Sequence, residues 1–402
     1  MPAAVRTRRS RAEVDACPGV FAPLDAAVGA LARIRLPGGA ITGDALRLLA
    51  DCADELGDGH VHLTSRGNLQ LRGLARTPVL AARLTGAGLL PSATHERVRN
   101  VLASPLSGVA GGIADVRGLA AALDRGLCAR PGLAALPGRF LFALDDGRGD
   151  VAAEDPDLCW RATSAADGVL LGAGVAVGAV ALDDAVRVLL DAAAAFLALR
   201  AADAGTAWRL AELAGGPARI GRLLGVGGRS GLRPGASGGT LPSPPPGDAA
   251  PPVAGLAAVP GPVRRDDGGL ALVVAPVLGE LAADQLRLLA DAARDAVVTP
   301  WRTVVLPDPR LPADELARAG LPVAPGPAAG VSACAGRPGC AKAVADVRAD
   351  ARAALGHLPP GRVHVSGCAR RCGAPRAPHV DAVALAGGGY LVDGVPRAGL
   401  VP

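Results

Sequence analysis

One eight-residue pattern, D-x-L-R-L-L-A-D, occurs twice in this chain, at residues 44–51 and again at residues 284–291. Each copy follows an apolar, strand-like run and precedes another strand candidate, so each half is predicted to form strand, helix, strand. A repeat at this spacing is too long for a solenoid and predicts a duplicated α/β half-domain packed as a pseudo-twofold pair. Within each copy, apolar residues recur at the i, i+3, i+4 spacing of an amphipathic helix: Leu46, Leu49 and Ala50, then Leu286, Leu289 and Ala290.

The rest of the chain differs from the repeat in composition. Residues 91–214 hold several strand candidates and a long Ala/Leu-rich helix candidate from about residue 183 to 201. Residues 215–262 are rich in Gly and Pro. Such a segment buries too little apolar surface to fold alone, so we expect a linker or a long surface loop there.

Composition and charge limit the classes of partner. The net charge of +5 favours an anionic partner, but aromatic residues make up only 2% of the chain, too few for base stacking, which argues against nucleic acid. The uncharged run at residues 168–182 is shorter than the roughly 20 residues that cross a bilayer, and no apolar segment follows the basic N-terminus. We therefore expect a soluble cytoplasmic protein with no membrane partner, in which the cysteines are free of disulfides.

Residues 60–74, HVHLTSRGNLQLRGL, alternate strictly between apolar or small and polar positions. A period of two predicts a β-strand whose apolar face meets the core. The polar face either meets water, as the outer face of an antiparallel sheet does, or binds an anion. It carries seven polar side chains and no acidic one: His60, His62, Thr64, Arg66, Asn68, Gln70 and Arg72.

Four of the eight cysteines form two close pairs. Five residues separate Cys334 from Cys340, and three separate Cys368 from Cys372. Two close thiolate pairs can surround a tetrahedral zinc ion or a cubane iron–sulfur cluster. Structural zinc sites favour two to four residues between paired ligands, so the gap of five counts against zinc. The others are expected to be ordinary small residues: Cys17, Cys52, Cys128 and Cys159.

The C-x5-C…C-x3-C pattern, with Gly367 before Cys368 and Gly373 after Cys372, resembles the iron–sulfur signature of the nitrite and sulfite reductase family. The resemblance implies a [4Fe–4S] cluster on the four paired cysteines. It also implies an α/β (α+β) chain with duplicated ferredoxin-like half-domains and two nitrite/sulfite-reductase-type α/β domains. The expected order is a first ferredoxin-like half-domain (18–90), a central tetrapyrrole-pocket α/β domain (91–214), the linker (215–262), a second ferredoxin-like half-domain (263–310) and an iron–sulfur cluster domain (311–402).

Three further motifs extend the resemblance. Thr64 to Arg66 is similar to the family's T-x-R segment and Arg99-Asn100 to its R-N segment, both of which place an arginine at the tetrapyrrole. LPGRFLFAL, residues 136–144, resembles the segment in which two alternating lysines donate protons in sulfite reductases. Those positions are Arg139 and Leu141 here, and Leu141 can supply no proton, which argues against siroheme chemistry. The resemblance thus implies catalytic roles for Arg66, Arg99, Asn100 and Arg139.

One branch of the family, the precorrin-3B synthases of aerobic cobalamin biosynthesis, is similar to nearly the whole chain apart from the linker. The shared features are a CPGVFAPLDA-like start at residues 17–26, the segment RIRLPGG, and LFALDDGRGD in place of the double-lysine segment. This similarity implies a monooxygenase that uses O2 and an NAD(P)H-linked electron donor to hydroxylate precorrin-3A with lactone formation. Arginine cannot activate oxygen, so the cluster edge or a second, non-haem iron would have to do so. The sequence does not reveal a 2-His-1-carboxylate set.

On this resemblance, the polar face of residues 60–72 binds the carboxylates of precorrin-3A. Arginine suits this role because its planar fork accepts a carboxylate bidentately and stays charged. His60 and His62 share a strand face, which makes them the first candidates among the histidines for such a second iron, but hydrogen bonding to carboxylates is the stronger expectation for both. The expected substrate lining is Arg33, Arg35, His60, His62, Thr64, Arg66, Asn68, Gln70, Arg72, Arg97 and Arg99.

Two other functions stay open at this point. The first is a siroheme-dependent sulfite or nitrite reductase that uses the same cluster. The second is a zinc-stabilised binding module with a basic face and no enzymatic activity. An optical spectrum, with iron, sulfide and zinc analysis, would separate the three.

Overall fold

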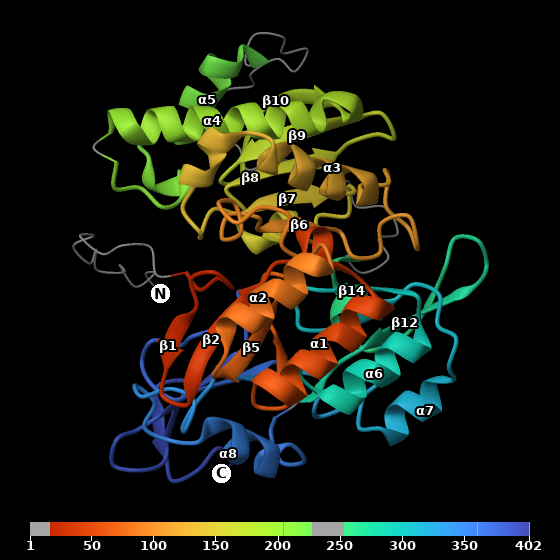
Figure 1. Cartoon of the computed structure of the whole chain (residues 1–402), viewed down its shortest axis with the longest axis vertical. Coiled ribbons are helices and arrows are strands. Elements are labelled where there is room, and N and C mark those ends of the chain that lie inside the picture. Colours follow the sequence, from red (N-terminus) through yellow and green to blue (C-terminus); the bar gives the residue numbers. More distant parts are fainter. Residues whose placement is uncertain (1–16, 204, 227–252, 360, 402) are drawn as a thin grey trace.

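The computed structural model describes residues 17–203, 205–226, 253–359 and 361–401. These residues form four five-stranded sheets with helices packed on them, which confirms the predicted α/β class. The central sheet and its long helix lie at one end of the molecule (Figure 1). The two halves of the repeat lie at the other end, with their long helices side by side.

The two halves of the repeat have the same order of elements, as the duplicated pattern predicts. The first consists of β1 (Leu24–Ala26), β2 (Gly29–Ile34), β3 (Ala40–Thr42), α1 (Gly43–Leu56), β4 (His60–Leu63), β5 (Leu69–Leu74) and α2 (Thr77–Gly86). The second consists of β11 (Gly261–Arg264), β12 (Leu270–Val274), β13 (Glu280–Ala282), α6 (Ala283–Ala292), β14 (Asp295–Val298), β15 (Val304–Leu306) and α7 (Ala313–Arg318).

The two halves exchange one strand each, which the sequence did not predict. The first sheet has the order β1-β2-β5-β4-β13, and the second has β11-β12-β15-β14-β3. In the first sheet Leu281 pairs with Val61, and in the second Ile41 pairs with Ala296. Each short strand thus covers the edge of the other half's sheet, where unpaired backbone groups would otherwise be exposed.

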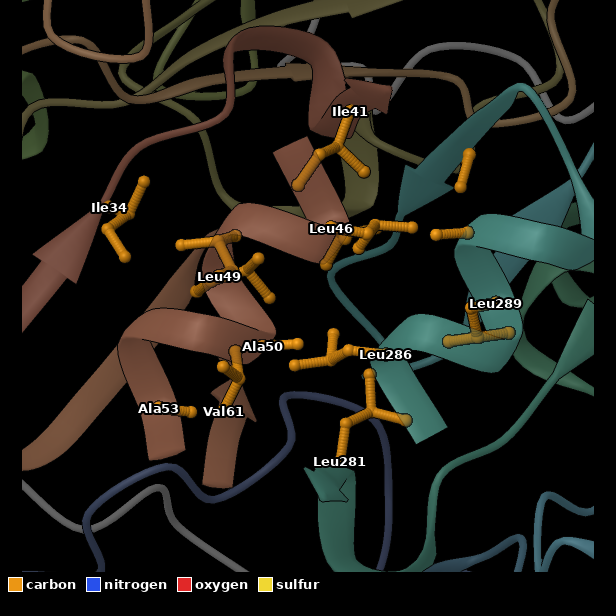
Figure 2. Packing of buried hydrophobic residues seen from close by; sticks show 14 of the residues in the cluster. Ile34, Ile41, Leu46, Leu49, Ala50, Ala53, Val61, Leu281, Leu286 and Leu289 are labelled. Carbon is orange, nitrogen blue, oxygen red and sulfur yellow. The ribbon is translucent and has the colours of Figure 1, made fainter. Parts of the chain in front are cut away.

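Both copies of D-x-L-R-L-L-A-D are helical, which confirms that prediction. The apolar faces of α1 and α6 meet in one core, where Leu46, Leu49, Leu286 and Leu289 are each at most 2% exposed (Figure 2). Ion pairs join the two helices at the surface of this core, with an arginine of each helix bound to aspartates of the other. Arg47 pairs with Asp291 at 2.6 Å, and Arg287 pairs with Asp51 and Asp54 at 2.8 Å.

Residues 60–74 form a hairpin, not one continuous strand. The Thr64 hydroxyl accepts the Asn68 N–H at 3.2 Å, and Gly67 has φ +61°, a conformation that favours glycine. The chain therefore turns between β4 and β5. The register, with Val61 opposite Leu71 and His62 opposite Gln70, keeps the predicted alternation, so the polar positions still share one face.

The central sheet has the order β10-β9-β8-β7-β6. The expected Ala/Leu-rich helix is α4, which packs on this sheet and contributes buried residues to its core. The elements here are β6 (Val101–Ala103), α3 (Arg117–Cys128), β7 (Phe142–Asp145), β8 (Leu158–Ala162), β9 (Asp167–Gly172), β10 (Val175–Ala181), α4 (Ala185–Ala202) and α5 (Gly216–Leu224).

The interpretation of residues 215–262 as a linker is too broad. Residues 216–224 form α5, whose Ile220 is fully buried in the central core. Pro217 lies in the first turn of this helix, and Gly215 and Gly225 flank it, so these residues cap a helix here. Strand β11 also begins before residue 262. Residues 227–252 of the expected linker, and the basic N-terminal segment, lie outside the described residues.

The C-terminal region forms the fourth sheet, in which β16, β17 and β18 are parallel and β19 and β20 antiparallel. No helix within the described ranges is long and apolar enough to cross a membrane. The elements are β16 (Val331–Ala333), α8 (Val347–Ala354), β17 (Val363–Ser366), β18 (Val380–Ala384), β19 (Tyr390–Val392) and β20 (Val395–Arg397).

Candidate functional site

Two adjoining cavities are lined jointly by the repeat and the C-terminal sheet. The larger, of about 820 Å3, contains all four paired cysteines in its lining, and we call it the cysteine cavity. The smaller, of about 620 Å3, is rich in arginine, and we call it the arginine cavity. The two cavities share lining residues: Ser65, Gly279, Arg302, Arg370 and Gly373.

The topology of the C-terminal sheet explains why the two cysteine pairs meet. Cys334 follows β16 directly, and Cys368 comes two residues after β17. These strands are parallel neighbours, so their carboxyl ends lie at the same edge of the sheet. The backbone N–H of Gly367 donates to the sulfur of Cys334 at 3.1 Å, which orients that thiol at the edge.

The spacing of the four thiols distinguishes between the two metal centres considered. A single tetrahedral zinc ion with Zn–S bonds of 2.3 Å would place its sulfurs about 3.8 Å apart. Within the described residues, no three of these four sulfurs lie within 4.8 Å of one another. A cubane cluster spans several atoms and needs the wider arrangement. Four free thiols around one cavity can hold a cluster, and they do not form a ready-made tetrahedral zinc site in this structure.

The polar face of the β4–β5 hairpin forms one wall of the cysteine cavity. His62, Thr64, Gln70 and Arg72 line it, together with Arg33 from the neighbouring strand β2. Burial lowers the pKa of both arginines, with nearby Arg348 acting in the same direction on Arg72. Burial also lowers the pKa of His62, which favours its neutral form.

Arg66 lies at the tip of the hairpin turn and lines the arginine cavity. Burial, reinforced by the neighbouring charges of Arg209 and Arg33, lowers the pKa of Arg66 to about 10. In the part of the chain that the structure describes, its guanidinium has no hydrogen-bond or ion-pair partner. A largely buried, unpaired guanidinium facing a cavity is a strong site for an anion, because only an anion repays its desolvation.

The second half of the repeat also places an arginine in this cavity, one position further along its turn. Thr299 accepts the N–H groups of Trp301 and Thr303 in the β14–β15 turn, as Thr64 accepts those of Arg66 and Asn68 in the β4–β5 turn. Arg302 lines both cavities, and burial lowers its pKa to about 10. Arg302 was not predicted from the sequence. In TPWRT, residues 299–303, it stands at the position of Gly67 in TSRGN, and both residues have positive φ, +62° and +61°, while Trp301 stands at the position of Arg66.

Several predicted site residues lie in the interior instead of on the cavity walls. Arg99 makes two bonds of 2.7 Å to Asp124 and donates to the Leu89 carbonyl, so its charge is already balanced. Arg35 is 1% exposed and lies within 3.7 Å of Glu96, because β2 ends before it and turns its side chain inward. The Asn68 side chain accepts the Leu36 N–H at 2.9 Å.

Asn100, His60, Arg97 and Arg139 also lie outside the lining of both cavities. Asn100 is buried and donates to the carbonyls of Arg97 and Gly138, and His60 contacts the Asp58 carbonyl. Arg139 is exposed and stacks over the Trp208 ring at 5.0 Å. Leu141, in contrast, does line the arginine cavity, so the position that carries a lysine in sulfite reductases is apolar here.

The motif LFALDDGRGD holds three buried acids that the sequence analysis did not single out. Oxygens of Asp145, Asp146 and Asp150 lie within 4.8 Å of one another, away from both cavity linings. Asp146 pairs with Arg148 at 2.5 Å, and Asp145 accepts backbone N–H groups. Burial raises the pKa of Asp150 to about 7. These contacts fit a structural role, closing the loop after β7.

Comparisons with known proteins agree with the motifs. Residues 28–85 match the family described as nitrite/sulfite reductase ferredoxin-like half domain. The ferredoxin–nitrite reductase of Synechococcus elongatus is 35% identical over 158 residues, which cover 37% of this chain and 30% of that protein. A precorrin-3B synthase from Sinorhizobium sp is 33% identical over 158 residues, which cover 38% of this chain and 34% of that protein. The matches thus span about a third of each relative.

The fold is similar to that of the Mycobacterium tuberculosis NirA protein. The two structures superimpose with a TM-score of 0.66 at 24% sequence identity, over 86% of this chain and 69% of that one. Together with the match at residues 28–85, this confirms the duplicated ferredoxin-like architecture. The predicted resemblance to the nitrite and sulfite reductase family is confirmed. Within that family, the similarity to a precorrin-3B synthase supports the predicted branch.

Proposed function

We propose that this chain is a precorrin-3B synthase. It would hydroxylate precorrin-3A with O2 and close a lactone, drawing electrons from an NAD(P)H-linked donor. One observation carries the proposal: a cavity bearing four free thiols adjoins a second cavity that is rich in arginine and has Leu141 in place of a proton-donating lysine. The partial match to a precorrin-3B synthase supports the same choice.

Cys334, Cys340, Cys368 and Cys372 would hold the [4Fe–4S] cluster. When bound, such a cluster supplies electrons one at a time. A cluster there would lie next to the arginine cavity, because Arg302, Arg370 and Gly373 belong to both linings. Basic side chains also surround the thiols, which suits a site that must hold several thiolates.

The arginine cavity suits a substrate with many carboxylates. An arginine-rich, partly desolvated wall can accept acetate and propionate groups bidentately, with each charge-assisted bond contributing about 1.5–3 kcal/mol. Arg66 is unpaired among the described residues, so it is available to such a group. The arginines of the lining are Arg66, Arg302, Arg362, Arg370, Arg371 and Arg376.

The second candidate is a siroheme-dependent nitrite or sulfite reductase, favoured by the 35% identity to a ferredoxin–nitrite reductase. Leu141 argues against it, because this apolar side chain stands where the sulfite reductases carry one of their two proton-donating lysines. An optical spectrum decides between them, since siroheme adds strong visible bands to those of the cluster. Metal analysis of the same sample would count any iron beyond the cluster's four atoms, as a second, non-haem iron requires.

The cluster assignment is tested with one ligand and one non-ligand cysteine. Anaerobically prepared Cys368→Ser protein is expected to lose the brown absorbance and the acid-labile sulfide. Cys128→Ser, on α3 and outside both cavity linings, is the matched control and should keep both. Zinc in place of iron and sulfide in the parent protein would support the non-enzymatic binding module instead.

The activity is tested by incubating the reconstituted protein with precorrin-3A, O2 and a reducing system. The expected product carries one added oxygen atom and a lactone. Consumption of nitrite or sulfite, with no change in precorrin-3A, would favour the reductase.

A further inference from the structure

We propose that Glu154 is the proton-transfer group of the arginine cavity. Of the described residues that line this cavity, Glu154 is the only acid, and the other ionisable groups there are arginines. Arginine stays protonated and exchanges no proton near neutral pH. Any reaction in this cavity that takes up protons therefore has one lining side chain that can deliver them.

The carboxyl group is held in place from two parts of the fold. Glu154 ends the short 3-10 helix η3 (Ala152–Glu154) of the central region, and its Oε1 accepts the indole N–H of Trp301 at 2.9 Å. Trp301 belongs to the β14–β15 turn that also carries Arg302. The next residue, Asp155, pairs with Arg376 at 2.7 Å, which fixes the loop beside the C-terminal region. Glu154 thus sits where the central region, the repeat and the C-terminal region meet.

The surroundings of Glu154 set its proton affinity. Burial raises its pKa, while the Trp301 hydrogen bond and the charges of Arg376, Arg362 and Arg302 oppose this shift without cancelling it. A carboxylic acid with a raised pKa keeps its proton closer to neutral pH, where general acids work best. The positive charges of the arginines limit the rise in the pKa of Glu154, so its carboxylic acid can also release the proton.

This inference rests on the proposed function, whose stoichiometry defines the proton demand. One atom of O2 becomes the new hydroxyl oxygen and the other becomes water, with two electrons from the nicotinamide-linked donor. If the acetate that closes the lactone starts ionised, three protons are consumed, one at the hydroxyl and two at the water. Glu154 supplies the hydroxyl proton: its own O–H bond breaks, an O–H bond forms on the substrate oxygen, and water reprotonates the carboxylate.

The first test does not require turnover. Tryptophan fluorescence is titrated with pH in the parent protein and in Glu154→Gln, which keeps the side-chain length and an oxygen for the Trp301 N–H. The parent should show a transition as Glu154 ionises beside Trp301, and the variant should lack it. Glu55→Gln, an exposed change on α1, is the control and should titrate as the parent does. Identical titrations in the parent and Glu154→Gln would overturn the inference.

The second test uses the cluster-loaded protein with precorrin-3A and O2. We expect Glu154→Gln to lower kcat by about 100-fold or more with KM changed less than threefold, as the loss of a general acid does. We also expect kcat of the parent to fall with rising pH, this dependence to vanish in Glu154→Gln, and Glu154→Asp to recover part of the rate. An active parent with an unchanged Glu154→Gln variant would refute the role. An inactive parent would count against the proposed function, and the fluorescence titration would still decide on Glu154.

Discussion

At the scale of single residues, two equivalent turns place two arginines in one cavity. Arg66 and Arg302 each follow a threonine whose hydroxyl accepts two backbone N–H groups of its turn. Arg66 is the third residue of its turn and Arg302 the fourth, and burial lowers the pKa of each to about 10. Arg35, in contrast, lies just past the end of β2 and is buried in the interior beside Glu96.

Arg66→Lys is expected to weaken precorrin-3A binding by about 1–2 kcal/mol. The change keeps the charge but loses the planar fork that accepts a carboxylate bidentately. The apolar face at Val61 and Leu71 is untouched, so stability should stay within about 0.5 kcal/mol. Affinity is measured by titration with precorrin-3A, and Arg294→Lys, at a side chain 84% exposed, is the control. Equal, negligible effects at both positions would assign the Arg66 side chain to solvent.

Asp150→Asn is expected to stabilise the protein at pH 8. The folded-state pKa of Asp150 is raised to about 7, mainly by burial, from a model-compound value of 3.8. The folded protein therefore binds more protons than the unfolded chain between these values, and wild-type stability falls as pH rises through this window. Asparagine does not ionise, so the variant does not lose this stability as pH rises. Its amide oxygen can still accept the Ser104 hydroxyl.

The gain in free energy of unfolding should grow from near zero at pH 4 to about 1–4 kcal/mol at pH 8. Urea unfolding at several pH values measures it. Asp308→Asn, at a side chain 86% exposed, should show no such growth. A pH-independent difference between wild type and Asp150→Asn would contradict the assignment of this shift to Asp150.

At the scale of elements, α1 and α6 form the contact that joins the two halves. Leu286 and Leu49 are fully buried in their shared core, and the reciprocal ion pairs lie at its surface. Exposed ion pairs contribute little to stability, whereas buried leucines contribute several kcal/mol each, so the apolar contact dominates.

Leu286→Ala is expected to lower the free energy of unfolding by about 2–5 kcal/mol, through lost burial and the cavity left behind. Leu223→Ala, on α5 at a position 60% exposed, makes the same chemical change and should stay within about 0.5 kcal/mol. Denaturant unfolding of both variants gives the comparison. If both variants lost similar free energy of unfolding, burial of leucine at the α1–α6 contact would not explain the stability of the two halves.

At the scale of the whole molecule, strand exchange makes the two halves one folding unit. Strand β13 completes the first sheet and β3 the second, and one hydrophobic core runs through both halves as far as Leu321. The segments that meet are more than two hundred residues apart in sequence. Neither half can bury its helix face or cover its sheet edge alone.

A fragment of residues 17–90 is therefore expected not to fold by itself. It lacks β13 and α6, which leaves the edge of β4 and the apolar face of α1 exposed. Circular dichroism should show no cooperative unfolding transition, and size exclusion should show aggregation. Co-expression with residues 253–323 should restore a compact, cooperatively unfolding complex. Cooperative unfolding of the isolated, monomeric fragment would contradict this prediction.

The sequence by itself determined the features that depend on local periodicity and spacing. These features are the repeated helices, the alternating faces of β4 and β5, and the close spacing of the cysteines within each pair. All of them depend on side chains a few residues apart, where helix and strand geometry is fixed. The family motifs predicted the similarity to nitrite and sulfite reductases that the comparisons found. The tertiary structure alone decided which polar residues face a cavity. Arg99 binds Asp124, and Glu154 accepts the Trp301 N–H, because distant segments of the chain come together. Arg66 has no such partner among the described residues. Burial and partner choice arise from non-local packing, and no local pattern encodes them.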